Sequence, residues 1–167
     1  MHETTGDFRV LKRTIHQQNP THRMKRNAKA HWTGDLKTGK GNLTTPSKVL
    51  DETSYSFESR FEDETGKSGT NPEELIAAAH AGCFTMALSN ELSDAGYEVK
   101  NLDTKAIVAI EPEGEGFKIP TVDLTLTAEV PGISEEEFQK IAHETKENCP
   151  VSKVLNAKIS LDATLKQ

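Results

Sequence analysis

The sequence predicts a single domain of the α+β class. Segments with strand-like alternation lie near both ends of the chain, and two segments between them carry helix-capping signals. The predicted order is βββ-α-ββ-α-α-β, in which strands and helices do not alternate regularly, and this pattern is typical of α+β folds. A chain of 167 residues, 34% of them apolar and 28% charged, is long enough for one hydrophobic core.

The first strands are predicted from alternation and from glycine-containing turns. Ala30–Thr33 and Asn42–Thr45 are short strand candidates, separated by turns at Gly34-Asp35 and at Gly39–Gly41. This arrangement indicates a β-meander. Tyr55–Phe61 then alternates aromatic and polar residues with a period of two, which predicts a third strand.

A long helix is predicted from Pro72 to about Asp94. Asn71 is a good N-cap, Pro72 suits the first helical position, and Glu74 completes a capping pattern. Gly96 can end the helix.

The middle of this helix is apolar on all sides. Between Leu75 and Leu88 only His80, Gly82 and Thr85 interrupt a series of Ala, Ile, Leu, Cys, Phe and Met. A helix of this kind must be covered on every face, and one small sheet covers only one face. We therefore expect a partner subunit on the other.

The last third of the chain predicts a hairpin, two helices and a closing strand. Ser134 and the glutamates after it cap the first helix, and Cys149-Pro150 ends it and starts a short second helix through Leu155. The predicted strands are Lys105–Ile110, Thr121–Val130 and Lys158–Lys166.

The charge is unevenly distributed. Residues 1–30 hold seven Lys and Arg against two acidic residues, so this segment carries +5 and the rest of the chain −11, for a net charge of −6. We expect residues 1–28 to be an N-terminal extension, either solvated or binding an anionic surface or a partner subunit, and residues 29–167 to form the domain. The net charge disfavours nucleic acid as a partner. No stretch is apolar enough for a membrane span or a signal peptide, so we expect a cytoplasmic protein.

Two cysteines are candidates for thiol chemistry. Cys83 lies in the middle of the apolar helix, where it could equally be a small core residue. Cys149 lies at the N-cap of the short helix, where free N–H groups favour a thiolate, although it could equally be a capping or core residue. A disulfide between them in a reducing compartment would be transient and chemical.

Arg60 and Glu73 are candidates for activating a thiol. A thiol is a poor nucleophile at its ordinary pKa of about 8.5, and a fixed guanidinium lowers that pKa by stabilising the thiolate. A carboxylate bound to the guanidinium would set its direction. The alternatives are that Arg60 is a solvated strand residue and that Glu73 only interacts with the helix dipole.

At these residues the sequence resembles the OsmC/Ohr family. The helix segment Asn71–Phe84 is similar to the family helix that carries the peroxidatic cysteine, and Asn148–Ser152 is similar to the segment around the second cysteine. The likeness extends from Ala30–Asp35 through Arg60–Glu62 to Lys158–Asp162. The His-Trp opening and the Glu-Glu pair after Asn-Pro indicate the OsmC branch.

The resemblance implies a thiol peroxidase. Cys83 would be the peroxidatic thiol, Cys149 the resolving thiol, Arg60 the activating cation and Glu73 its carboxylate partner. It also implies an intertwined homodimer with antiparallel sheets wrapped around long buried central helices, and sites at the interface. The apolar residues around Cys83 (Leu75, Ile76, Phe84 and Met86) favour an organic hydroperoxide as substrate, with hydrogen peroxide reduced less well, and the resemblance implies a lipoyl-type dithiol as reductant. No metal, flavin or haem cofactor is implied.

Two other functions fit the same residues. The thiol pair could serve a redox-sensing or ligand-binding protein without turnover, or the chain could be a structural dimerisation domain with inert cysteines. Geometry adds one constraint on an enzyme: Glu73 and Cys83 lie ten residues apart on one helix, roughly 15 Å along its axis. Glu73 must then act through Arg60 or on the site of a partner subunit.

Overall fold

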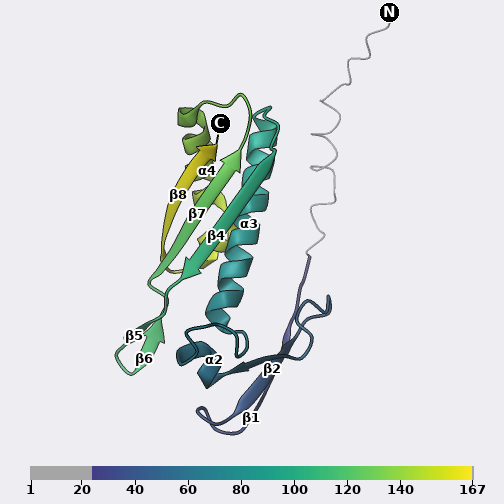
Figure 1. Cartoon of the computed structure of the whole chain (residues 1–167), viewed down its shortest axis with the longest axis vertical. Coiled ribbons are helices and arrows are strands. Elements are labelled where there is room, and N and C mark those ends of the chain that lie inside the picture. Colours follow the sequence, from purple (N-terminus) through teal and green to yellow (C-terminus); the bar gives the residue numbers. More distant parts are fainter. Residues whose placement is uncertain (1–23, 167) are drawn as a thin grey trace, which may run out of the picture.

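The computed structural model describes residues 24–166, and most of the predicted basic extension lies outside them. A long helix, α3 (Pro72–Asp94), runs through the structure, with a small sheet at one end and a second sheet along the rest of its length (Figure 1). The arrangement is of the α+β class, as predicted. No helix within residues 24–166 is both long and apolar enough to cross a membrane.

The first sheet is an antiparallel meander in the order β1-β2-β3. Its strands are β1 (Lys29–Thr33), β2 (Lys40–Thr44) and β3 (Thr53–Ser56). The prediction of a turn over Gly39–Gly41 was wrong at its second half, because β2 already includes Gly41. Trp32 and Tyr55 pack against each other across this glycine, with ring centroids 5.3 Å apart.

The predicted strand Tyr55–Phe61 was wrong after its second residue. Strand β3 ends at Ser56, and Phe57–Phe61 form a short helix, α2. Ser56 and Ser59 form a reciprocal capping box that starts this helix. Phe57 and Phe61 are four residues apart in the sequence, so both lie on the same face of the helix, with their ring centroids 5.0 Å apart. Arg60 therefore projects from a helix rather than from a strand.

Helix α3 (Pro72–Asp94) has the bounds that the sequence predicts. The side chain of Asn71 accepts a hydrogen bond from the backbone N–H of Glu74, as expected of an N-cap. Within the single chain only one face is buried, and a stripe at every fourth position occupies it: His80, Phe84, Leu88 and Leu92. The opposite face is exposed at Ala78, Ala79, Gly82 and Met86. The chain itself therefore covers half of an apolar helix.

The second sheet packs on the buried face of α3 in the order β4-β7-β8. The predicted hairpin is confirmed as the antiparallel pair β4 (Asn101–Val108) and β7 (Thr121–Glu129), and the link between them forms a two-stranded ribbon of β5 (Glu111–Glu113) and β6 (Gly116–Lys118). Strand β8 (Lys158–Lys166) lies parallel to β7, so the expectation of purely antiparallel sheets was wrong here. Two intervening helices return the chain to the starting end of β7, which makes the pair parallel.

These two helices are α4 (Glu135–Asn148) and α5 (Pro150–Val154). Ser134 caps α4, and Cys149 is the residue at which α4 ends and α5 begins, as predicted. The core combines one face of α3, the inner face of β7 and one face of α4. Its members are Phe84, Leu88, Leu92, Val122, Leu124, Leu126, Ala128, Val130, Phe138, Ala142 and Cys149.

We predict that Gly41→Ala destabilises the first sheet. A Cβ at this position would lie 2.6 Å from the carbonyl oxygen of His31 and would meet the rings of Trp32 and Tyr55. Overpacking of this kind costs about 1–3 kcal/mol of unfolding free energy, which urea unfolding measures. Gly116→Ala is the matched control, since the nearest atom to its added Cβ is 3.8 Å away. Equal stability of the two variants would contradict the prediction.

Candidate active site

The packing of α5 against α3 brings the two cysteines together. Cys83 and Cys149 are 66 positions apart in the sequence, yet Cys83 packs against the core cluster that includes Cys149, and each thiol shifts the pKa of the other. Cys149 is buried, with 1% of its surface exposed, whereas Cys83 is half-buried. The two thiols are therefore placed to form a disulfide, and only Cys83 has an open side.

Cys149 is surrounded by hydrogen-bond donors. Its burial alone would raise its pKa, but the backbone N–H groups of Ser152 and Val151, the thiol of Cys83 and the hydroxyl of Ser152 outweigh that effect. The pKa of Cys149 is consequently lowered. This agrees with the sequence-based expectation for a cysteine at a helix N-cap.

Cys83 has the opposite shift. Its burial raises the pKa of the thiol, and the neighbouring Cys149 raises it further, while the backbone N–H of Val151 acts in the other direction. Two adjacent thiolates would repel each other, so ionisation of one thiol disfavours ionisation of the other. Within the single chain, the charge is favoured at Cys149.

Arg60 and Glu73 form a two-point ion pair between α2 and the first turn of α3. The Nε of Arg60 donates to one carboxylate oxygen of Glu73 at 3.1 Å, and its Nη2 donates to the other at 2.8 Å. Glu73 is buried, and the guanidinium carbon lies 5.0 Å from the centre of the Phe61 ring. A guanidinium held in this way is fixed in direction.

The structure thus assembles the four predicted residues as two separate pairs. Cys83 meets Cys149, and Arg60 meets Glu73. The main influences on the pKa of Cys83 are burial, Cys149 and the Val151 backbone, and no cation of residues 24–166 is among them. Within the single chain, Arg60 is bound to Glu73 and does not act on the thiol of Cys83.

Arg60 borders an apolar cavity of about 300 Å³ between the first sheet and α2. Half of its lining residues are aromatic, and among residues 24–166 the guanidinium is the one charged group that lines it. The lining residues are Trp32, Leu36, Tyr55, Ser56, Phe57, Arg60, Phe61 and Pro72. Such a cavity suits a ligand with an apolar body and a polar end.

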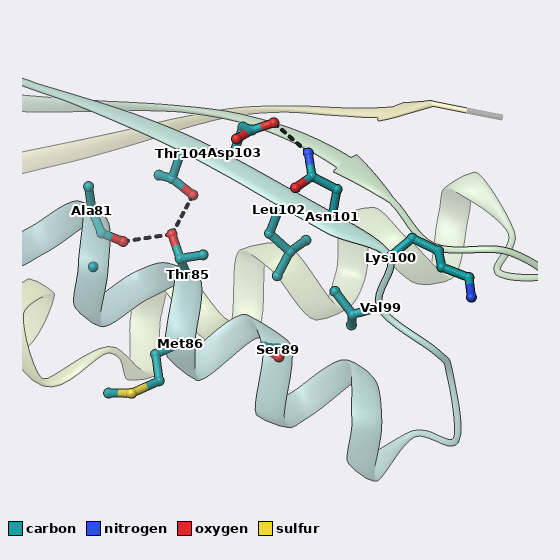
Figure 2. A pocket seen from close by; sticks show the side chains of 11 residues that line it. Ala81, Thr85, Met86, Ser89, Val99, Lys100, Asn101, Leu102, Asp103 and Thr104 are labelled. Carbon is teal, nitrogen blue, oxygen red and sulfur yellow. Dashed lines mark hydrogen bonds between the residues drawn. The ribbon is translucent and has the colours of Figure 1, made fainter.

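A shallow groove runs between the open side of α3 and the edge strand β4 (Figure 2). The Thr85 hydroxyl lies within hydrogen-bonding distance of the Ala81 carbonyl at 2.7 Å and of the Thr104 hydroxyl at 2.6 Å, tying the helix to the strand. Met86 extends away from the strand and is 73% exposed. The groove therefore continues the exposed apolar face of α3.

Sequence reasoning missed two residues beside the thiols. His80 is fully buried one turn before Cys83, and its Nε2 lies 2.8 Å from the Oγ of Ser152. A signal was present, since His80 interrupts an otherwise apolar stretch, and buried polar side chains need partners. Within residues 24–166, no group of three or more His, Cys, Asp and Glu side chains could hold a metal ion.

An α+β fold that holds two thiols in contact defines a cysteine-based redox protein. Residues 64–164 match the family described as OsmC-like protein. Peroxiredoxin OsmC of Escherichia coli is 49% identical over 137 residues, which cover 82% of this chain and 94% of the relative. The chain belongs to the OsmC-like family. With this degree of identity to peroxiredoxin OsmC, it is a cysteine-based peroxidase of the OsmC branch.

Relatives of the Ohr branch are more distant. The organic hydroperoxide resistance protein OhrB of Bacillus subtilis is 29% identical over 75% of this chain and 89% of its own. Its crystal structure superposes with a TM-score of 0.58 over 84% of this chain and 98% of its own. An organic hydroperoxide resistance protein of Elizabethkingia anophelis gives a TM-score of 0.63 at 25% identity, covering 86% and 99% of the two chains. The fold is that of the family.

We predict that one equivalent of a thiol oxidant links Cys83 to Cys149 within one chain, because the two thiols are already in contact. Mass spectrometry should record the loss of two hydrogens, and a non-reducing gel should give the mobility of a single chain. Cys83→Ser is the control, since it leaves no internal partner for Cys149. A product consisting only of disulfide-linked chain pairs would contradict the prediction.

Proposed function

We propose that this peroxidase reduces organic hydroperoxides to alcohols with Cys83 as nucleophile and Cys149 as resolving thiol. The Cys83 thiolate attacks the terminal peroxide oxygen, the O–O bond breaks, and the alcohol leaves after taking up a proton. Cys83 becomes a sulfenic acid, and Cys149 then displaces its oxygen as water to form a disulfide. An external dithiol reduces that disulfide by exchange. The contact between two thiols 66 positions apart carries this proposal.

Exposure supports this division of roles between the thiols. A peroxide molecule must reach the sulfur that attacks it, and Cys83 is half-buried while Cys149 has 1% of its surface exposed. The resolving thiol needs to reach only Cys83, which it already contacts. The buried position of Cys149 therefore suits the second step and not the first.

The cavity beside Arg60 supports an organic substrate. The guanidinium can donate hydrogen bonds to the peroxide oxygens, and the aromatic wall can bury an alkyl or aryl group. Hydrogen peroxide has no apolar part and gains nothing from that wall, so we expect it to be the poorer substrate. The relatives named for organic hydroperoxide resistance are consistent with this substrate class.

We further propose that the active enzyme is an intertwined homodimer with composite sites. Burial raises the pKa of Cys83 within its own chain, so a reactive thiolate needs a cation from elsewhere. Glu73, to which Arg60 is bound, precedes Cys83 by ten residues, roughly 15 Å along the helix axis. An antiparallel second copy of α3 would bring Arg60 and Glu73 of one subunit to Cys83 of the other.

The open face of α3 supports this dimer. Ala78, Ala79 and Gly82 are small enough for close helix approach, and Met86 is 73% exposed beside them. Burying this face and the groove along β4 removes apolar surface from water, which drives association. Sheets from both subunits would then enclose two central helices.

A reducing cytoplasm and a lipoyl-type dithiol fit the catalytic cycle. The Cys83–Cys149 disulfide must be reopened after each turnover, and a dithiol does so by forming its own internal disulfide. The proposed role is protection against oxidative stress by removal of hydroperoxides. A redox sensor built on the same thiol pair would be oxidised once per cycle of signalling instead of turning over.

Turnover distinguishes these functions. With excess dithiol, we predict that the protein consumes many equivalents of an organic hydroperoxide, whereas a sensor would consume one. Cys83→Ser should abolish consumption, and Cys149→Ser should accumulate a sulfenic acid at Cys83, detected by mass spectrometry after trapping. Continued turnover by Cys83→Ser would overturn the assignment of the nucleophile.

Subunit mixing tests the composite site. Arg60→Ala and Cys83→Ser homodimers should each be inactive, but a heterodimer pairs the cysteines of the first subunit with the Arg60 of the second. We predict recovery of roughly half the activity of a wild-type dimer per heterodimer, because one of two symmetric sites is restored. Mixing Cys83→Ser with Cys149→Ser is the control and should restore nothing. Absence of recovery, with subunit exchange verified by native mass spectrometry, would mean that each chain completes its own site.

A further inference from the structure

His80 is a buried polar side chain that the catalytic steps above do not use. It is fully buried in the apolar stripe of α3, one turn before Cys83. Its Nε2 contacts Ser152 Oγ of α5 at 2.8 Å, and its Nδ1 has no partner among the residues that the structure describes. Placing an imidazole in an apolar core costs free energy unless its ring nitrogens are hydrogen-bonded, and here only Nε2 has a partner among the described residues.

The unpartnered Nδ1 indicates which tautomer of His80, and so which direction of this hydrogen bond, is favoured. A buried N–H without a partner is rarer than a buried acceptor without one, so the proton belongs on Nε2 and the lone pair on Nδ1. Burial lowers the pKa of His80, which keeps the ring neutral. The Nε2–H group therefore donates to Ser152 Oγ.

Ser152 connects the hydrogen bond from His80 to Cys149. Its hydroxyl has one proton, and because the oxygen already accepts from His80, that proton is free to point to the sulfur of Cys149. The placement of Ser152 three residues after Cys149, in the helix that Cys149 caps, allows a directed chain from His80 Nε2–H to Ser152 Oγ–H to Cys149 Sγ. The backbone N–H groups of Val151 and Ser152 reach the same sulfur.

We propose that His80 and Ser152 are positioning residues for the resolving step, in which their hydrogen-bond chain holds Cys149 in place and stabilises its thiolate for attack on oxidised Cys83. This inference rests on the proposed roles of Cys83 and Cys149. In the step itself the Cys149 thiolate attacks the sulfur of the Cys83 sulfenic acid, an S–S bond forms and the S–O bond breaks. The oxygen leaves as hydroxide and takes up the proton that Cys149 released, so water is the only other product.

The hydrogen-bond chain matters at this step because Cys149 can ionise only after Cys83 has lost its negative charge. Before the peroxide arrives, a thiolate at Cys83 would keep Cys149 protonated, since two adjacent thiolates repel. Oxidation makes Cys83 a neutral sulfenic acid and removes that repulsion. Cys149 can then ionise beside its own donors, and because Nε2 of His80 is itself a donor, the Ser152 hydroxyl does not give its proton to His80.

The charged side chains that line the same small cavity as Ser152 have other partners. Lys146, Glu147 and Lys153 line the same small cavity as Ser152. Lys146 and Glu147 form an ion pair with each other at 2.8 Å, and Lys153 donates to the side chain of Asn148 at 3.2 Å. Apart from the thiol of Cys83, the side-chain influence on the pKa of Cys149 therefore comes from the uncharged Ser152, which His80 contacts.

The test separates the two chemical steps by rapid mixing of the full-length, reduced protein with an organic hydroperoxide. Sulfenic acid at Cys83 is trapped and quantified by mass spectrometry, and disulfide formation is followed by counting free thiols after acid quenching. We expect Ser152→Ala and His80→Leu to form sulfenic acid at the wild-type rate but to close the disulfide about tenfold or more slowly, since a hydrogen bond to a charged group is lost. Excess peroxide should then drive these variants further, to sulfinic acid at Cys83.

Conservative variants and one control complete the experiment. Ser152→Thr keeps the hydroxyl and His80→Gln keeps a donor near Nε2, so both should recover most of the rate of disulfide closure. Ser93→Ala removes an exposed serine hydroxyl that contacts only its own helix, at the carbonyl of Ser89, and should match wild type in both steps.

The outcomes are distinguishable. If Ser152→Ala closes the disulfide at the wild-type rate, or slows both steps equally, the positioning role is wrong. If Cys149→Ser, with His80 and Ser152 intact, traps no sulfenic acid at Cys83, the proposed function itself fails. Slow closure in Ser152→Ala, restored in Ser152→Thr, supports the hydrogen-bond chain.

Discussion

The contact between α5 and α3 is the interaction on which the site depends. Helix α5 has five residues, too few to be stable alone, so its position is set by what it packs against. Burial of Cys149 in the core and the hydrogen bond between His80 and Ser152 hold it there. Because Cys149 is both the end of α4 and the start of α5, this packing places its thiol beside Cys83.

The shared charge of the two thiols explains why their surroundings differ. Cys149 lies among backbone and hydroxyl donors that lower its pKa, while burial raises the pKa of Cys83. A peroxidase needs its solvent-facing thiol ionised first and its buried thiol ionised second. The chain alone favours the reverse order, and a guanidinium brought to Cys83 in the proposed dimer would correct it.

In the proposed dimer, the open face of α3 and the separation of the two residue pairs would have one physical origin. Half of an apolar helix is uncovered in the single chain, and the Arg60–Glu73 pair lies near its first turn while Cys83 lies near its middle. A second copy running antiparallel would cover the open face and join the two pairs of residues. In this arrangement dimerisation is a condition of catalysis and also of burying the apolar face.

The sequence by itself determined the elements whose signals are local. Asn71 and Pro72 set the start of α3, Cys149-Pro150 set the break between α4 and α5, and alternation predicted β7 and β8, because capping and periodicity act within a few residues. The family motifs likewise identified the two cysteines, Arg60 and Glu73 as candidates. Only the tertiary structure decided that the segment after Ser56 forms α2, since the spacing of its aromatic residues fits both the two-residue period of a strand and the four-residue spacing of a helix face. It also decided that β8 runs parallel to β7, which thiol has the lower pKa and that His80 reaches Ser152, because these depend on packing between segments distant in the sequence.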